Sequence, residues 1–315
     1  MTRVLVTGGA GFIGSHVVDA LRTAGHEATV LDDLSSGRRE NLPSDAPLEL
    51  LDVRTPEAAR LAEEGGFDAL LHLAAQMDVR RSTEDPLFDA SVNVLGLLNV
   101  VGAAVRGGAR QVIFASTGGA IYGEQSTHPA PETHPTRPVS PYGVSKLAGE
   151  RYLDYYHLEL GIDVACLRFA NVYGERQSPH GEAGVVAIFL ERLLSGRPCT
   201  IHGDGLQTRD YVHVSDVARA TVACLGRPGF RVYNVGTGVE TSVVDLYRAL
   251  AAAAGSDEPP RHGPAKPGEQ RRSSVDPSRL LSELGLPRPL ALTDGLARTT
   301  AWFAARQPAA PERGE

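Results

Sequence analysis

The chain is poor in cysteine, tryptophan and methionine. Its 315 residues include three Cys, one Trp and two Met, and the cysteines (Cys166, Cys199 and Cys224) stand far apart with no CxxC pair. Such sparse cysteines indicate free thiols rather than a disulfide framework or a zinc site. We therefore expect a reducing compartment, the cytoplasm, and no metal centre.

The sequence also lacks an excess of positive charge and a long apolar run. Its formal net charge is -7, which argues against a nucleic-acid binder, because such proteins carry basic patches. No apolar run approaches the length of a membrane span, and the first apolar run already begins at Val4. We expect no nucleic-acid partner, no membrane association and no leader segment.

What the first two-thirds of the chain does contain is an alternation of apolar runs and helical stretches. The apolar runs are continuous, as in parallel strands that are covered on both faces. Strands are predicted at Val4–Val6, Ala28–Leu31, Leu48–Leu51, Ala69–Leu73, Val112–Ala115 and Val164–Phe169. Helices are predicted at Ile13–Ala24, Pro56–Glu64, Pro86–Arg106 and Pro141–Leu160. The alternation predicts an α/β fold with a doubly wound, Rossmann-type parallel sheet.

The alternation breaks after residue 172, which predicts a second, smaller domain. A loop rich in Gly, Pro and His leads into a predicted helix at Val185–Ser195. Two short strands, Tyr211–His213 and Arg231–Val235, could add to the main sheet. The expected parts are a dinucleotide-binding domain over 1–172 with 208–236, a mixed C-terminal substrate-binding domain over 173–207 and 237–306, and a tail over 307–315.

A glycine-rich turn joins the first predicted strand to the first predicted helix. Gly8, Gly11 and Gly14 are spaced by three residues, which permits a tight turn, close approach of the backbone to a pyrophosphate, and close packing of helix on strand. The N–H groups of the helix N-terminus would then face the phosphates. Phe12 and Ile13 are expected in the same site. A glycine turn without a ligand is the alternative, which the strand–turn–helix context disfavours.

Two aspartates, Asp32 and Asp33, follow the second predicted strand. An acid there accepts hydrogen bonds from the adenosine ribose and repels a 2′-phosphate, which favours NAD over NADP. Arg38 and Arg39 could instead receive such a phosphate. Asp52 follows the third strand, where it could meet the adenine edge or be solvated. The other residues expected around this half of the cofactor are Leu34, Ser36, Gly37 and Val53.

Tyr142 and Lys146 are four residues apart in a predicted helix, so both face the same side of it. A free tyrosine has a pKa near ~10, and a base that works near neutral pH needs this pKa lowered by roughly 3 units. A lysine ammonium about 4 Å away supplies that much at an effective dielectric of roughly 20. A buried helical tyrosine without a chemical role is the alternative.

Ser116 and Thr117 end the strand that precedes this helix and could bring a hydroxyl to the same place. Thr117 would hydrogen-bond a substrate oxygen and relay a proton to Tyr142. Ser116 is the competing candidate, and a structural hydroxyl is its alternative role. A hydroxyl at this strand end favours a catalytic interpretation of Tyr142 and Lys146.

Together, the glycine turn, the strand-end hydroxyl and the Tyr142–Lys146 pair resemble the extended short-chain dehydrogenase/reductase family over residues 1–306. Within it, the chain most resembles the bacterial UDP-glucose 4-epimerases. The segments that carry this likeness are 116–123, 140–146, 168–174 and 203–212. The family's 4,6-dehydratases have an Asp-Glu pair after the strand-end threonine. This chain has Gly118 and Gly119 there, which argues against dehydration.

The resemblance implies which residues line the site. Around the cofactor it implies Leu73, Ala74, Ala75, Gln76, Asn93, Ser116, Tyr142, Lys146 and Phe169. Around the substrate it implies Thr117, Asn171, Val186, His202, Arg209, Arg271 and Ser273. Arginine suits a diphosphate because its guanidinium binds two phosphate oxygens at once. Lys266 and Arg272 compete with Arg271 for that role.

Other substrate-side assignments leave alternatives open. Arg209 could instead form an ion pair with Asp204 or Asp210. His202 stands where an aromatic residue of the family commonly stacks on uracil. Ser273 stands where some members have a tyrosine that limits the pocket, so an N-acetylated sugar could fit, although a surface serine would explain it equally.

The resemblance implies an NAD-dependent epimerase that inverts C4 of a UDP-sugar through a transient 4-keto intermediate. The substrate would be the UDP-glucose/UDP-galactose pair or its N-acetylated counterpart. One alternative is another UDP-sugar-modifying member of the family, a uronate 4-epimerase, a decarboxylase or an unusual dehydratase. A second alternative is a non-catalytic NAD sensor, which would not need the combination of Thr117, Tyr142 and Lys146.

The resemblance also implies a homodimer. The helices predicted at Pro86–Arg106 and Pro141–Leu160 could pair with their copies into a four-helix contact. Their apolar faces could equally belong to the core of the sheet.

Overall fold

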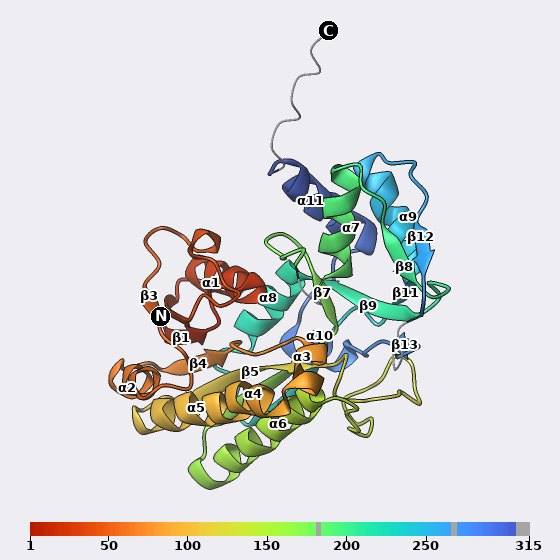
Figure 1. The fold of residues 1–315 in the computed structure, drawn as a ribbon. Coiled ribbons are helices and arrows are strands. Elements are labelled where there is room, and N and C mark those ends of the chain that lie inside the picture. The colour runs from red at the N-terminus through yellow and green to blue at the C-terminus, as the bar shows by residue number, and fades with distance from the viewer. Residues whose placement is uncertain (181–183, 266–269, 307–315) are drawn as a thin grey trace.

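A seven-stranded parallel sheet forms the centre of the protein in a computed structural model, which describes residues 1–180, 184–265 and 270–306 (Figure 1). The strand order is β10-β6-β5-β4-β1-β2-β3. The strands are β1 (Arg3–Thr7), β2 (Glu27–Asp32), β3 (Leu48–Leu50), β4 (Ala69–His72), β5 (Gln111–Thr117), β6 (Asp163–Phe169) and β10 (Phe230–Val235). This topology confirms the predicted doubly wound, Rossmann-type fold.

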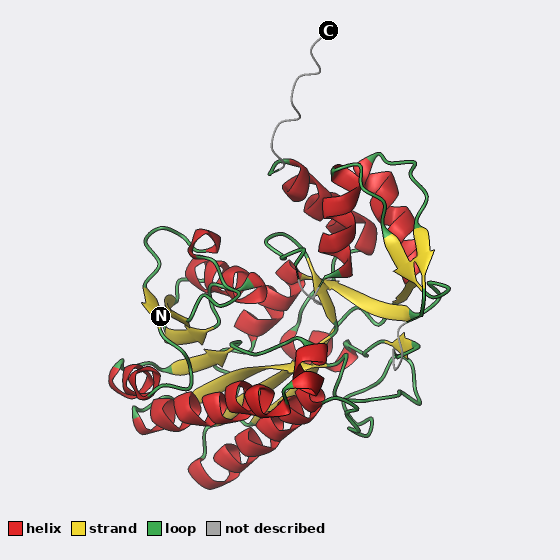
Figure 2. Ribbon diagram, viewed as in Figure 1, coloured by secondary structure: helices red, strands yellow, loops and turns green. Residues whose placement is uncertain are grey.

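Helices cover both faces of the sheet because its strands are apolar on both sides (Figure 2). In β1, Val4 and Val6 belong to one buried cluster and Leu5 to the other. The first cluster includes side chains of α1 (Phe12–Thr23), α8 (Val214–Ala223) and α10 (Ser278–Leu284). The second includes side chains of α2 (Pro56–Glu64), α5 (Leu97–Arg106) and α6 (Pro141–Leu160).

A smaller layer of short strands and helices adjoins the carboxyl ends of the main strands (Figure 1). Its strands are β7 (Asn171–Tyr173), β8 (Thr200–His202), β9 (Thr208–His213), β11 (Glu240–Ser242), β12 (Arg261–Gly263) and β13 (Arg272–Ser273). Its helices are α7 (Val185–Leu194), α9 (Val243–Ala254) and α11 (Leu292–Ala304), which share a third apolar cluster.

One of the two strands that could add to the main sheet does so and the other does not. The run Arg231–Val235 lies in β10, which pairs with β6 over Val164–Phe169. The run Tyr211–His213 lies in β9, so its assignment to the main sheet was wrong. Because β10 occupies the free edge of β6, β9 pairs instead with β7, β11 and β13.

Helix α6 begins and ends at residues whose chemistry fixes its bounds. The Ser140 hydroxyl accepts a hydrogen bond from the Gly143 N–H (3.2 Å), and Pro141 takes the first helical position. Gly161 ends the helix in a left-handed conformation, with φ 67°. Tyr142 therefore lies in the first, N-terminal turn of α6. A loop connects this end of the helix to β5.

The helical stretch Pro86–Arg106 corrects the expectation that no run approaches a membrane span. It comprises α4 (Pro86–Ala90), a π-helical segment (Ser91–Gly96) and α5, and it is long and apolar enough to cross a membrane by length and composition, with a mean hydropathy of 1.6. Nevertheless 44% of its most apolar window is buried, and its Asp89 and Asn93 are hydrogen-bonded to each other inside the fold. A buried, hydrogen-bonded polar pair of this kind is typical of a helix packed in a protein core.

Candidate active site

A cavity of about 910 Å³ lies where the carboxyl ends of the main strands meet the smaller layer. Ligands of open α/β sheets bind at this edge. Of the residues that the sequence assigned to the cofactor or substrate, the cavity wall contains Phe12, Ile13, Leu34, Ser36, Gly37, Ser116, Thr117, Tyr142, Phe169, Asn171, Val186, His202 and Arg209. The fold thus brings predicted residues that are as far apart in the sequence as Phe12 and Arg209 into the wall of one cavity.

The glycine turn before α1 is as tight as its spacing predicted. Gly8 has φ +71°, and a Cβ atom there would lie 2.6 Å from the Ala74 backbone nitrogen. A Cβ atom at Gly14 would lie 2.1 Å from the Gly8 carbonyl oxygen. Gly11, the residue before α1, has no side chain to cap the helix, so the helix N-terminus faces the cavity without a competing side-chain acceptor. This arrangement fits the diphosphate of a dinucleotide.

The acidic residues expected at the adenosine half differ in their environments. Asp32 is buried, and its two oxygens accept hydrogen bonds from the backbone N–H groups of Ala10 and Leu34, each at 2.9 Å. Burial raises the pKa of Asp32. Asp33 is exposed and accepts a hydrogen bond from the Ser35 N–H (2.9 Å). Asp52 pairs with Arg54, whose hydrogen bonds lower the pKa of its carboxyl.

Thr117, Tyr142 and Lys146 come together as predicted by their positions in the sequence. Thr117 and Tyr142 share a hydrogen bond. The Lys146 ammonium donates to the Ala115 carbonyl (2.8 Å) and lies 5.8 Å from the centre of the Tyr142 ring. The neighbouring Ser116 hydroxyl donates to Glu150 Oε1 (2.6 Å), so it is Thr117 that pairs with the tyrosine.

The electrostatics of this group correct the sequence-based expectation. We expected Lys146 to lower the pKa of Tyr142, but the surrounding protein raises it to about 12, because it desolvates this half-buried side chain and Asp89 is nearby. The hydrogen bond from Thr117 opposes this rise. Burial likewise lowers the pKa of Lys146 to about 8, and Asp89 opposes that fall. Desolvation is therefore the largest cause of both pKa shifts.

The substrate-side residues divide into those that face the cavity and those that do not. Arg209 lines the cavity and donates to the Thr208 carbonyl (2.8 Å). Arg271 forms an exposed ion pair with Asp204 (2.9 Å), and Ser273 is buried in β13; neither is a lining residue. Of the competitors of Arg271, Arg272 pairs with Glu240, while Lys266 lies outside the described residues.

Several lining residues were not anticipated from the sequence. Met77, Tyr173, Gln177, Phe189 and Tyr211 all face the cavity. Met77 lies in the loop after β4, Tyr173 in β7, Gln177 in the loop after β7, Phe189 in α7 and Tyr211 in β9. Nothing in their local sequence marks them, since only the packing of these elements places them on one surface.

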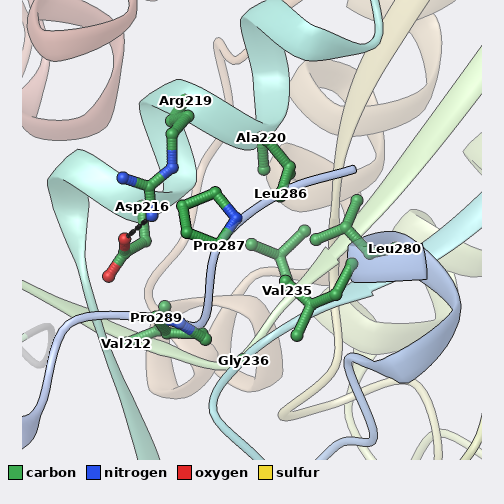
Figure 3. Close-up of a pocket in the computed structure, with 11 residues that line it drawn as sticks. Val212, Asp216, Arg219, Ala220, Val235, Gly236, Leu280, Leu286, Pro287 and Pro289 are labelled. Atoms are coloured by element: carbon green, nitrogen blue, oxygen red, sulfur yellow. Dashed lines mark hydrogen bonds and ion pairs between the residues drawn. The ribbon is translucent and has the colours of Figure 1, made fainter. Parts of the chain in front are cut away.

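A second hollow lies between α8, β10 and α10 and contains none of the predicted residues (Figure 3). Its volume of about 10 Å³ leaves room for roughly one water molecule. Asp216 and Arg219 form an ion pair at one side of it, and Leu280 and Pro287 supply apolar walls. Its size makes it a packing defect rather than a ligand site.

Comparison with known proteins agrees with this geometry. Residues 4–236 match the model of the NAD dependent epimerase/dehydratase family. The chain is 46% identical to a UDP-glucose 4-epimerase of Mycolicibacterium smegmatis, over 96% of this chain and 98% of that one.

Solved structures of epimerases share the same fold, as the following pair illustrates. A UDP-glucose 4-epimerase of Thermotoga maritima, solved with UDP-glucose, has a TM-score of 0.94 and 42% identity, over 96% of this chain and 99% of that one. A UDP-glucose 4-epimerase of Thermus thermophilus, solved with NAD, has a TM-score of 0.91 and 44% identity, over 97% of this chain and all (100%) of that one. The predicted family, fold class and NAD dependence are confirmed: the chain belongs to the NAD dependent epimerase/dehydratase family.

Proposed function

We propose that this protein is an NAD-dependent epimerase that inverts C4 of a UDP-sugar, with UDP-glucose and UDP-galactose as the first candidates. The observation that carries the proposal is the hydrogen-bonded Thr117–Tyr142 pair beside Lys146, in the wall of a cavity that extends to Phe12 and Ile13 at the start of α1. The relatives named above, which cover nearly the whole chain, support the same activity.

In this proposal each residue of the group has one task. NAD, held at the turn formed by Gly8, Gly11 and Gly14, would supply a hydride acceptor for C4, and its positive nicotinamide ring would favour the Tyr142 phenolate. Tyr142 removes the proton of the 4-hydroxyl, and Thr117 holds the same oxygen by a hydrogen bond. Lys146, tethered to the Ala115 carbonyl, keeps a positive charge near the phenolate. After the 4-keto sugar has rotated in the site, the hydride would return to the other face of C4 while Tyr142 returns the proton to the oxygen, so no net oxidation would occur.

The substrate-side residues supply the anchor about which the sugar turns. We propose that Asn171, Val186, His202 and Arg209, which line the cavity, contact the nucleotide part. Holding the diphosphate fixed keeps the intermediate in the site while its sugar ring rotates. Arg271 could bind the diphosphate only if it released its ion-pair partner Asp204.

The packing around Gly118 weighs against a dehydratase. A Cβ atom at Gly118 would lie 2.8 Å from Val275 Cγ1 and 3.2 Å from the Arg168 carbonyl oxygen. A carboxylate side chain therefore does not fit after Thr117 unless Val275 moves. The family's 4,6-dehydratases carry such a carboxylate at this place, so the packing around Gly118 disfavours dehydration.

We propose further that the protein forms a homodimer in the cytoplasm. The outer face of Pro86–Arg106 and α6 exposes large apolar side chains, among them Leu87 (83%), Leu95 (62%), Tyr155 (57%) and Leu158 (73%). An apolar surface of this kind is typical of a protein–protein contact. The three buried free cysteines suit a reducing compartment. In the same proposal residues 1–172 carry the cofactor, and 173–207 with 237–306 carry the substrate.

A substrate panel tests the function. The purified protein would be incubated with NAD and, separately, UDP-glucose, UDP-N-acetylglucosamine and UDP-glucuronate, and the products identified by NMR. We expect UDP-galactose from UDP-glucose, with no net change in NAD. A 4-keto-6-deoxy product would identify a dehydratase, loss of carbon dioxide from UDP-glucuronate a decarboxylase, and NAD binding without turnover of any sugar a sensor.

A further inference from the structure

Asp89 is a fully buried carboxylate beside the catalytic group, and the proposed reaction leaves it without a task. It lies on α4 with an exposed fraction of 0%. It accepts hydrogen bonds from Ser145 Oγ (2.6 Å), Asn93 Nδ2 (2.9 Å) and Gln76 Nε2 (3.1 Å). All three donors are neutral, so none of them cancels a negative charge. Burying such a charge is costly, and groups of this kind gather at functional sites.

The three donors belong to three different parts of the site. Ser145 directly precedes Lys146 on α6, Gln76 lies in the loop after β4, and Asn93 lies in the π-helical segment. Gln76 and Asn93 are also joined to each other by two hydrogen bonds, each 2.9 Å long. Asp89 thus ties the catalytic turn of α6 to the loop on which the cofactor is expected. A π-helical segment beside this junction is typical of functional sites.

The charge on Asp89 acts on both members of the catalytic pair. It raises the pKa of Tyr142 and also that of Lys146. The other titratable groups around the pair have little net charge to offer. From β4, His72 is neutral, because burial and Lys146 hold its pKa near about 3. One turn further along α6, Glu150 is paired with Arg168 (2.7 Å).

We propose that Asp89 is a positioning residue of the catalytic site: it fixes the Tyr142–Lys146 turn to the cofactor loop through Ser145, Gln76 and Asn93 and places a buried negative charge beside that turn. The proposal rests on the proposed function only for the chemistry that the pair performs. The placement of the carboxylate does not depend on which sugar is bound.

The variant Asp89→Asn separates the charge from the hydrogen bonds. The amide oxygen can still accept from Asn93 and Gln76, and the amide nitrogen can donate to the Ser145 hydroxyl. Because the lost charge had raised both pKa values, the pair should release its proton at lower pH. We expect the rising acid limb of the kcat–pH profile to move down by about one pH unit, the usual order for the loss of a neighbouring buried charge.

A readout that needs no turnover accompanies the kinetics. Tyrosinate absorbance of the NAD-loaded protein would be titrated with pH, and the matching Tyr142→Phe background subtracted for the parent and for Asp89→Asn. The difference isolates the ionisation of Tyr142, which should also move to lower pH in Asp89→Asn. If the parent inverts no UDP-sugar but this titration shifts, the proposed function fails and the role of Asp89 stands.

Ser145→Ala is the matched control, because it removes one hydrogen bond and leaves the charge in place. We expect its acid limb and its tyrosinate titration to stay at the parent position. Coincident titrations of the parent and Asp89→Asn would overturn the proposal. Asp89→Ser, which is smaller and also neutral, is the second test; if both Asp89 variants fail to fold, Asp89 is a structural anchor only and the proposal is equally overturned.

Discussion

Two buried carboxylates form hydrogen bonds at helix α6, Glu150 on the helix itself and Asp89 on the neighbouring α4, and their partners differ in charge. Glu150 receives two hydrogen bonds from Arg168, at 2.9 and 2.7 Å, and the side chains of both are 5% exposed or less. Asp89 receives its hydrogen bonds from a hydroxyl and two amides. The first carboxylate is therefore neutralised where it stands, whereas the second keeps a charge that reaches Tyr142 and Lys146.

The comparison shows that a buried carboxylate can accept several hydrogen bonds and still have no positive charge to compensate its own. The Arg168–Glu150 pair continues through Tyr122, whose hydroxyl bonds Arg168 (3.0 Å) and Asn234 (2.6 Å), and so joins α6 to β6 and β10. That network stabilises the packing behind the site. The Asp89 network lies within the site, where an uncancelled charge has an electrostatic effect. Substitutions in the two networks should accordingly change different measurable quantities.

The largest expected effect is on catalysis, from Tyr142→Phe. Removing the phenolic oxygen removes the proposed base, so kcat should fall about 10²–10⁴-fold while NAD binding persists. Tyr122→Phe is the matched control, because it removes a buried tyrosine hydroxyl from the Glu150 side and should leave kcat near the parent value. Steady-state kinetics and fluorescence of the bound dinucleotide measure both. Turnover near the parent value in Tyr142→Phe would refute the assignment.

The next effect is on stability, from Glu150→Gln. The change leaves the Arg168 guanidinium buried without a counter-charge, which should lower the free energy of unfolding by about 3–5 kcal/mol. Asp89→Asn should lower it by less, because no buried cation loses a hydrogen-bonded partner. Urea denaturation of the three proteins compares these values. A loss in Asp89→Asn equal to that in Glu150→Gln would remove the distinction between the two networks.

The smallest effect is expected from Ser116→Ala. Its hydroxyl donates to Glu150 rather than to Tyr142, so the variant should lose about 1 kcal/mol of stability and little activity. Thr117→Ala, one residue further along β5, should instead lose kcat because its hydroxyl bonds Tyr142. Parallel assays of kcat and thermal unfolding separate the two. Equal losses of kcat would mean that both strand-end hydroxyls act in the reaction.

The features that the sequence predicted are those with a local signature. The glycine turn, the apolar strands of the main sheet and the four-residue spacing of Tyr142 and Lys146 each depend on residues close together in the chain. Asp89 was missed, because a lone acid in an apolar helical stretch carries no such signature. The direction of the Tyr142 pKa shift was missed for a related reason, since burial and Asp89 both come from the packing around α6.

The substrate side illustrates the same limit. The strand Tyr211–His213 was recognised, but its partners β7, β11 and β13 lie in three distant parts of the chain. Likewise, no spacing could reveal that Arg271 reaches back to Asp204. The lining residues Phe189 and Tyr211 meet only because α7 and β9 pack in one layer.

By itself the amino-acid sequence determined the α/β architecture, the dinucleotide turn and the side of α6 on which Tyr142 and Lys146 lie, because hydrogen-bonding geometry and hydrophobic periodicity act over a few residues. Tertiary structure alone decided which charges surround that pair and which residues wall the cavity. The reason is physical: desolvation and Coulomb interactions depend on distance in space, and separation along the chain does not report that distance.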